Sequence, residues 1–287
     1  MKKTIVYVVS TNYAGSHYLS LMLGSHSRAA YLGEIRQYTL GKTDERVCYR
    51  CKDTTRCPLF RDVDAHDIPQ IYEGLSRNLR DSADVLIDNS KLVSWARNFV
   101  GDDRYHKRYV HVIRDPRALA RRWDLRHPRG RRRLKQRWGT LRRNPLAFLP
   151  ILFGGRTGLY AHKWLNTNRG ITRFLSGYDL EHIMVTYQDL ARDPEGEIRR
   201  LMDWLRLPFE PEQLNYWNFE HHGTQKKGYE WIGGQQKRYF DMRWKEHLTP
   251  AEQEWLATYP PVTAYAQSLR LTLTDDGLTR KGRRPQP

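Results

Sequence analysis

The start of the chain constrains the fold more than any other segment. An apolar, mostly β-branched run occupies residues 5–9, a polar loop occupies residues 10–17, and a leucine-rich run occupies residues 18–23. This order predicts a buried strand, a turn and a helix. Small residues at 14–16 directly before a helix leave backbone N–H groups and the positive end of the helix dipole free to hold a phosphate. An ordinary strand-to-helix turn has the same pattern, so both interpretations stay open at this point.

Strand and helix patterns alternate along the rest of the chain. Further strands are expected at residues 84–88, 109–113 and 183–187, and the clearest helices at residues 159–176 and 194–206. Asp193 and Pro194 supply an N-cap and a first-turn proline for the last of these helices. Alternation of this kind is typical of parallel strands joined by helices, so we predict an α/β fold with a central parallel sheet.

The length of 287 residues fits one α/β domain with insertions. We place this domain at residues 1–272, with insertions at about 35–80 and 123–158. The basic end of the chain, residues 273–287, has no clear periodicity and is expected to be disordered.

The formal net charge of +17 indicates a polyanionic partner, such as nucleotide phosphates, an acidic polymer, anionic lipid or nucleic acid. No nucleic-acid reader motif is present, so a specific nucleic-acid partner is not expected. Basic residues crowd positions 121–143, and an apolar run at 145–153 follows that is too short to span a bilayer. Residues 121–153 fit either contact with an anionic membrane surface or a basic surface helix followed by a packed loop. With no signal peptide recognised, we expect a cytoplasmic protein that can attach to the inner face of the membrane.

A second phosphate site is indicated after the strand at residues 109–113. Arg114 follows that strand, where α/β folds place their ligands, and its planar guanidinium suits bidentate phosphate binding. Asp115 can cap a helix that begins at Pro116, and Arg122 lies about two turns along that helix. The alternative for Arg114 is a structural ion pair with a carboxylate.

With both phosphate sites in view, the chain resembles the sulfotransferases that use 3′-phosphoadenosine-5′-phosphosulfate (PAPS), and its motif order is similar to that of protein-tyrosine sulfotransferases. The segments that carry this resemblance are Gly33-Glu34, Asp88-Asn89-Ser90-Lys91, Trp164 to Leu175, residues 185–194 and residues 239–245. The resemblance implies a three-layer, P-loop-like fold, PAPS as the sulfuryl donor, 3′-phosphoadenosine-5′-phosphate (PAP) as the product, and no required metal. It also implies an acceptor hydroxyl on a glycan, a glycolipid or another small molecule, and basic charge at 123–158 favours an anionic acceptor.

The resemblance also implies roles for individual residues. Glu34 falls where the family has the base that takes the acceptor proton, and Lys91 where a lysine neutralises the leaving phosphate. Tyr13 replaces the basic loop residue of relatives, so His17 or Lys91 is expected to supply that cation. Arg122 replaces a serine of relatives and can still bind phosphate. The residues implied to contact PAPS are Tyr13, Ala14, Gly15, Ser16, His17, Tyr18, Arg114, Arg122, Tyr187, Lys227 and Arg243.

Two other functions stay open. A P-loop kinase or NTPase shares the architecture, but its phosphate loop needs Gly-Lys-Ser/Thr, and this chain has Gly15-Ser16-His17. The substitution at Tyr13 leaves open a PAPS-binding protein with little activity. Without the resemblance, Glu34 would be a helix-end salt bridge and Lys91 a solvated cap.

The chain has three cysteines, at positions 48, 51 and 57. An odd number argues against a disulfide framework, and the spacing is that of half a zinc site, with His66 as a candidate fourth ligand. Redox chemistry and simple packing are the alternatives. From the sequence we expect packed, structural cysteines and sub-stoichiometric zinc. The adjacent pair His221 and His222 makes a poor joint metal site, because neighbouring side chains point apart in an extended segment.

Overall fold

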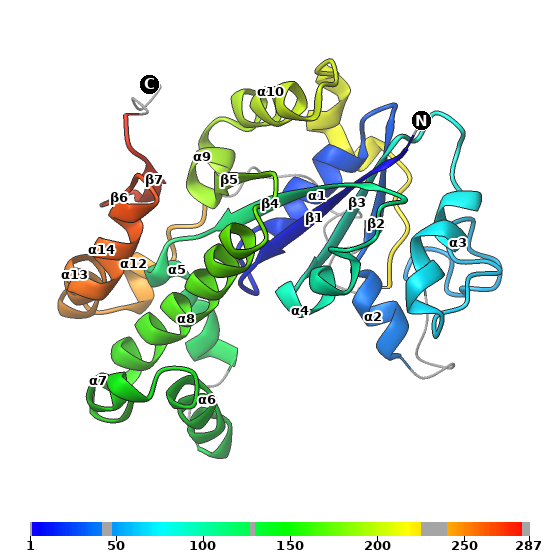
Figure 1. Ribbon diagram of the computed structural model, residues 1–287. Helices are drawn as coiled ribbons and strands as arrows, with labels where there is room; N and C mark the ends of the chain where they lie inside the picture. The colour runs from blue at the N-terminus through cyan, green and yellow to red at the C-terminus, as the bar shows by residue number, and fades with distance from the viewer. Residues whose placement is uncertain (1, 42–47, 127–129, 225–239, 283–287) are drawn as a thin grey trace.

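The computed structural model describes residues 2–41, 48–126, 130–224 and 240–282. Its centre is a five-stranded sheet in which all strands are parallel, in the order β2-β3-β1-β4-β5 (Figure 1). The strands are β1 (Thr4–Ser10), β2 (Ala29–Gly33), β3 (Val85–Lys91), β4 (His106–Ile113) and β5 (His182–Thr186). The predicted α/β fold with a central parallel sheet flanked by helices is confirmed.

The two faces of the sheet are covered by different helices, as β1 illustrates. Ile5, Tyr7 and Val9 belong to the apolar core shared with α8 (Gly155–Gly177), whereas Val6 and Val8 belong to the core shared with α1 (Ser16–Gly24) and α10 (Pro194–Leu205). Successive side chains of a strand point to opposite faces, so a continuous apolar run is what a strand buried on both sides requires. Figure 1 shows α8 crossing one face of the sheet.

Shorter helices fill the connections. Between β2 and β4 lie α2 (Ile35–Leu40), η2 (Ile68–Gln70), α3 (Ile71–Arg77), α4 (Val93–Ala96) and η3 (Arg97–Phe99). After β4 come α5 (Pro116–Arg126), α6 (Arg131–Leu141), η4 (Pro145–Ala147) and α7 (Phe148–Phe153). After β5 come α9 (Tyr187–Arg192), η5 (Pro211–Asn218), α12 (Trp244–His247), α13 (Pro250–Thr258) and α14 (Pro260–Ser268).

Local signals explain where several elements begin. Asp193 caps α10 by accepting a hydrogen bond from the Gly196 N–H at 2.8 Å, and Pro194 is its first residue, as predicted. The predicted helix at 159–176 is α8, which begins earlier, at Gly155. Strand β2 was not predicted, because its short sequence AAYLG has no β-branched residue.

The end of the chain corrects one prediction. Strands β6 (Leu271–Thr274) and β7 (Gly277–Arg280) form an antiparallel hairpin, so residues 273–280 are not a disordered tail. Leu278 is fully buried against α5, α8 and the C-terminal helices, and Arg280 pairs with Asp189 and Glu197. The composition of the tail is basic, but tertiary contacts stabilise its first half as a strand pair.

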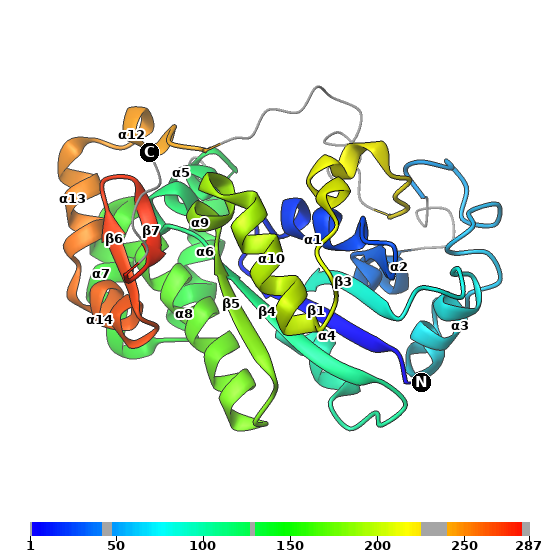
Figure 2. The same cartoon turned by 90° about the horizontal axis from the view of Figure 1, so that it is seen from above.

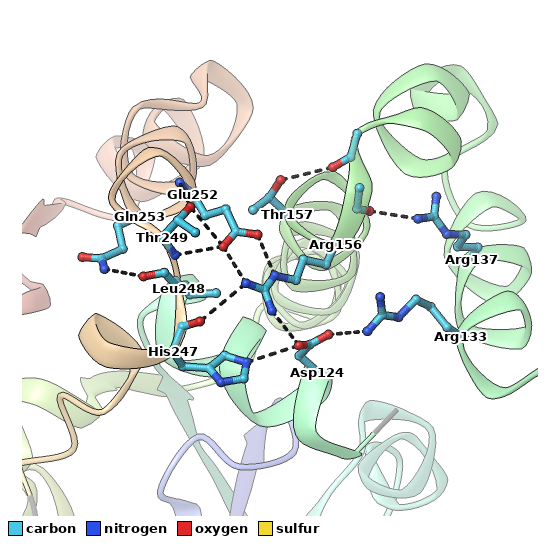
Figure 3. Close-up of polar contacts among 12 residues, drawn as sticks. Asp124, Arg133, Arg137, Arg156, Thr157, His247, Leu248, Thr249, Glu252 and Gln253 are labelled. Atoms are coloured by element: carbon cyan, nitrogen blue, oxygen red, sulfur yellow. Dashed lines mark hydrogen bonds and ion pairs between the residues drawn. The ribbon is translucent and has the colours of Figure 1, made fainter. Parts of the chain in front are cut away.

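The basic stretch at 121–143 is partly structural. Asp124 on α5 accepts from Arg133 and, at 2.8 Å, from Arg156, and His247 lies 3.2 Å away (Figure 3). Arg137 donates to the Ile151 and Leu152 carbonyls at the end of α7 and, at 3.0 Å, to the Gly155 carbonyl at the start of α8. These contacts fasten α6 to α5, α7 and α8. Within the described part of the chain, no helix is both long and apolar enough to cross a bilayer.

Candidate functional site

The carboxyl edge of the parallel sheet is where the predicted site residues meet, as expected for an open α/β sheet. The loop after β1 leads directly into α1, and Gly15 at its end has φ +93°. A Cβ at Gly15 would lie 2.4 Å from Cδ2 of Tyr187, so both the backbone conformation and the packing require glycine here. Figure 2 shows α1, α5 and α9 along this edge of the molecule.

A buried charge cluster lies on one side of this loop. The Glu34 carboxylate, which follows β2, forms a direct ion pair with the Lys91 ammonium at the end of β3. The Nε2 of His17, on α1, lies 3.2 Å from Oε1 of Glu34 and 3.2 Å from the Lys91 nitrogen. The side chains of Glu34 and Lys91 are 6% and 10% exposed. All three residues predicted to be catalytic therefore touch one another.

The imidazole of His17 is oriented by its other nitrogen. Asn89 donates its side-chain N–H to Nδ1 at 2.8 Å, and the Tyr31 hydroxyl lies 3.2 Å from the same atom. An Nδ1 that accepts from Asn89 leaves the proton on Nε2, which then donates to Glu34. Asn89 and Tyr31 thus position His17, although sequence reasoning assigned neither a role.

The turn that presents Lys91 rests on Asp88. This buried carboxylate accepts from the Tyr72 hydroxyl, from the Trp95 indole at 2.7 Å and from the Ser90 backbone at 2.7 Å. Burial raises the pKa of Asp88, against the opposing effect of these hydrogen bonds. Lys91 itself has φ +67°, a left-handed conformation that is uncommon for a non-glycine residue and is concentrated at functional sites.

An arginine cluster lies on the other side of the loop. Asp241 receives hydrogen bonds from Arg114 at 2.8 Å and Arg243 at 2.7 Å, and Arg122 is 3.5 Å away. Burial alone would raise the pKa of Asp241, but the hydrogen bond from Arg243 and the charges of Arg114 and Arg122 hold it well below its usual range. The carboxylate is therefore ionised and keeps three guanidinium groups together.

Arg114 is the link between the arginine cluster and the loop. Its Nη1 donates to the Tyr13 carbonyl at 2.9 Å, and its guanidinium stacks 3.9 Å from the centre of the Tyr187 ring. The Trp164 indole on α8 donates to the Arg114 carbonyl at 2.8 Å and so holds the backbone of Arg114 in place. The structural alternative considered for Arg114, a carboxylate pair, is thus present in the structure.

The remaining predicted contacts are distributed as follows. Ala14 and Ser16 are buried in the loop and the first turn of α1, and Tyr18 packs edge-on against Tyr216. Tyr13 has φ +73° and packs against the apolar cluster formed by α5, α8 and the C-terminal helices. Lys227 lies outside the described residues. Asp241, the carboxylate that the three arginines share, was not predicted as a site residue, although the resemblance included its segment at residues 239–245.

The three cysteines also come together, and with an unexpected partner. The sulfur atoms of Cys48, Cys51 and Cys57 surround Nδ1 of His222, at 3.7, 3.4 and 3.4 Å. His66, the candidate fourth ligand from the sequence, is exposed and is not a member of this group. His221 points elsewhere, with Nε2 2.9 Å from the Tyr216 carbonyl, so the two adjacent histidines do point apart.

Comparison with solved structures identifies the fold. A sulfotransferase from Alicyclobacillus acidocaldarius is similar with a TM-score of 0.50 and 16% identity, over 92% of this chain and 94% of the other. The sulfotransferase domain from the curacin biosynthetic pathway is similar with a TM-score of 0.49 and 18% identity, over 90% of this chain and 97% of that domain. Retinol dehydratase in complex with androsterone and the inactive cofactor PAP has a TM-score of 0.40 and 13% identity, over 88% of this chain and 78% of the other. The sequence itself matches no protein-family model and no curated protein.

The chain therefore has a sulfotransferase-type α/β fold, which confirms the fold class inferred from the sequence. At these identities the likeness extends to the fold and not to individual residues.

Proposed function

We propose that this protein transfers the sulfuryl group of PAPS to a hydroxyl of an acceptor molecule. The observation that carries the proposal is the contact among Glu34, Lys91 and His17 beside the loop that precedes α1. A carboxylate, an ammonium group and an imidazole, all largely buried at the carboxyl edge of a parallel sheet, match what in-line group transfer to a hydroxyl requires.

The arginine cluster fits the 3′-phosphate of the donor. The Nε atoms of Arg114 and Arg122 are buried and have no hydrogen-bond partner among the described residues. A buried N–H without an acceptor is costly, and a phosphate oxygen would supply one. Burial lowers the pKa of Arg122. The Asp241 charge opposes this and the like charges of Arg114 and Arg243 add to it, so an added anion would relieve the repulsion.

The loop between the two clusters fits the 5′-phosphosulfate. Gly15 leads into α1, whose N-terminus has no side-chain cap hydrogen bond, and the N-terminus of a helix favours an anion. Arg114 holds one end of this loop through the Tyr13 carbonyl, and His17 ties the start of α1 to Glu34. The donor would thus lie across the loop, with a phosphate at each end.

The chemistry then divides between Glu34 and Lys91. Glu34 takes the proton from the acceptor hydroxyl as the new oxygen–sulfur bond forms. The bond from sulfur to the 5′-phosphate oxygen breaks at the same time, and Lys91 neutralises the charge that develops on that oxygen in PAP. Because the two side chains are paired in the structure, Lys91 leaves Glu34 for the donor phosphate when PAPS binds.

Two alternatives remain against this proposal. A P-loop kinase would need a lysine in the phosphate loop, and the loop at 11–15 has none. A PAPS-binding protein without activity would keep the arginine cluster but would not need the Glu34–Lys91–His17 contact.

Calorimetric titration with PAP and with ATP, followed by a transfer assay with radiolabelled PAPS and an extract of glycans and lipids, tests the proposal. We expect PAP to bind at least ten times more tightly than ATP, and label to appear in a hydroxyl-bearing product. Tighter binding of ATP would favour a kinase. Tight PAP binding with no labelled product from any extract would favour the inactive binder.

Helices α6 and α7 carry a prominent apolar surface, which we define as the α6–α7 surface. Most of the large apolar side chains that are exposed in the described residues lie here: Leu134, Trp138, Leu146, Phe148, Leu149, Leu152 and Phe153. Basic residues 131, 132, 135, 142 and 143 are exposed on the same segment. Figure 1 shows α6 and α7 projecting away from the sheet.

We propose that the α6–α7 surface contacts an anionic lipid surface from which the acceptor is taken. Apolar side chains beside exposed arginines and lysines are the combination that binds such surfaces. Sedimentation with phosphatidylglycerol vesicles should deplete the protein from solution, and phosphatidylcholine vesicles should not. The double variant Trp138→Ser, Phe153→Ser should remain in solution, whereas Leu40→Ser, at another exposed apolar site, should bind normally. Equal sedimentation of the double variant and the wild type would exclude this role.

A further inference from the structure

The cysteine–histidine group lies outside the site described above and has the donor set of a metal centre. Cys48, Cys51 and Cys57 each offer a sulfur atom and His222 offers Nδ1, and all four atoms lie within 4.8 Å of one another. Cys48 and Cys57 are fully buried, and the side chain of His222 is 13% exposed. The histidine is 165 or more positions away along the chain, so only folding brings the four atoms together.

We propose that these four side chains bind one structural Zn²⁺ ion. Three cysteines and one histidine are a standard closed ligand set for structural zinc. A tetrahedral ion at about 2.3 Å from sulfur and about 2.0 Å from nitrogen holds the two kinds of atom roughly 3.5 Å apart. The observed sulfur-to-nitrogen distances of 3.4, 3.4 and 3.7 Å agree with that geometry.

The arrangement is poorly explained by packing alone. The Nδ1 of a neutral imidazole has a single lone pair, so it can accept a hydrogen bond from only one of the three thiols that surround it. An ion at the centre would satisfy all four atoms at once. A disulfide would join two of the cysteines and leave the third beside the histidine without a role.

The surroundings of His222 orient it as a ligand. Its Nε2 lies 3.4 Å from the Glu220 carboxylate, which in turn accepts a 2.8 Å hydrogen bond from Arg50. A carboxylate at Nε2 favours the tautomer with the proton on that nitrogen, and this leaves the Nδ1 lone pair directed at the sulfur atoms. Histidine ligands of zinc are commonly oriented by such a carboxylate.

The proposed ion would join two loops beside the candidate active site. The Tyr49 N–H donates to the Gly223 carbonyl at 3.0 Å, so the cysteine loop and the segment of His222 already lie together. Gly33 packs so closely on Gly223 that a Cβ at Gly33 would lie 3.2 Å from its Cα. Because Glu34 follows Gly33, loss of the ion should loosen the segment that carries the proposed base.

This interpretation reverses our expectation of sub-stoichiometric zinc. The sequence displays the cysteine spacing but does not reveal that His222, rather than His66, approaches it.

Metal analysis of the full chain, purified with reductant and without chelator, tests the proposal. We expect about one zinc per chain in the wild type and most of it to be lost in Cys51→Ser and in His222→Ala. The matched control His66→Ala should keep its zinc. Protein grown with added zinc that contains less than about a tenth of an equivalent, or variants that retain the wild-type content, would overturn the proposal.

A second measurement does not depend on the variants being folded. Titration of native wild-type protein with a mercurial thiol reagent should release the zinc as the cysteines react, and the thermal midpoint should fall. Replacement by Co²⁺ should produce the intense visible absorption of a tetrahedral thiolate site. One reactive thiol and a disulfide under non-reducing conditions would instead show that the group is a redox pair. None of these readouts depends on sulfuryl transfer, so the zinc site and the proposed activity can fail separately.

Discussion

The carboxylate of Glu34 and the ammonium of Lys91 form a buried ion pair, although Glu34 follows strand β2 and Lys91 ends strand β3. Neither charge is exposed enough to be stabilised mainly by water, so each depends on the other and on His17. In the catalytic role proposed for Glu34 and Lys91, this pairing would keep both groups charged and in place until the donor and acceptor bind.

The first prediction concerns this pair. Glu34→Gln keeps the shape of the side chain but cannot take a proton, so turnover should fall by roughly 10²–10⁴-fold with little change in PAP affinity. Lys91→Met removes the charge and keeps the length, and it should cost a comparable factor. A steady-state transfer assay measures both. Lys2→Met, at an exposed position just before β1 and so at the opposite end of the sheet, is the matched control and should keep full activity. Normal turnover in Glu34→Gln would remove it from the mechanism.

The second prediction concerns the arginine cluster. Arg114→Ala should weaken PAP binding by about 2–5 kcal/mol, because a charge-assisted bidentate contact is lost. Titration calorimetry gives the affinity, and circular dichroism checks that the variant is folded. Arg114→Lys should be intermediate, since a lysine keeps the charge but not the fork. The control is Arg199→Ala, which removes one charge from α10. If Arg114→Ala is folded and binds PAP as tightly as the wild type, Arg114 serves only to hold Asp241 and Tyr13.

The third prediction concerns the loop. Tyr13→Arg restores the basic residue of the family that the sequence resembles, and activity should be equal or higher. The ring of Tyr13 packs against the C-terminal apolar cluster, so the same variant should be somewhat less stable. Tyr13→Phe keeps the ring and its packing, so it should lose less stability than Tyr13→Arg. A large loss of activity in Tyr13→Arg would mean that the active conformation of the loop depends on the tyrosine side chain.

The fourth prediction concerns pH. Burial lowers the pKa of His111 to about 4, against the opposing hydrogen bond of its Nε2 to Asn168. An unfolded histidine titrates near 6.5, so between pH 6.5 and 4 the unfolded chain binds more protons than the folded one. The free energy of unfolding should therefore decrease as the pH is lowered from 6.5 to 4. His111 alone accounts for a loss on the order of 3 kcal/mol over this range.

Urea unfolding at several pH values, for the wild type and for His111→Gln, isolates the contribution of His111 to the free energy of unfolding. The variant should be less stable at pH 7 and should lose less stability on acidification. Carboxylates and the cysteine–histidine group are the same in both proteins, so their contribution cancels in the comparison. Parallel pH profiles would show that His111 is not buried in its neutral form.

Local patterns were sufficient to predict much of the framework. The β1–α1 loop, the strand that ends before Arg114 and the capped start of α10 are each encoded within about a dozen neighbouring residues. Glu34 and Lys91 were singled out through the resemblance of short motifs to a known family, and their proposed roles stay predictions. Strand β2 was missed because a short, alanine-containing edge segment has little intrinsic β-preference, and it is ordered by pairing with β3.

By itself, the sequence determined the α/β class, the position of the loop between β1 and α1, and the position of Arg114 after β4. Those features depend on side-chain periodicity and on turn and capping residues, which act over a few positions of the chain. Tertiary structure alone decided that Asp241 gathers the arginines, that His222 joins the cysteines and that Leu278 anchors a C-terminal hairpin. These are contacts between distant segments, and their formation depends on how the whole chain packs, which no local pattern records.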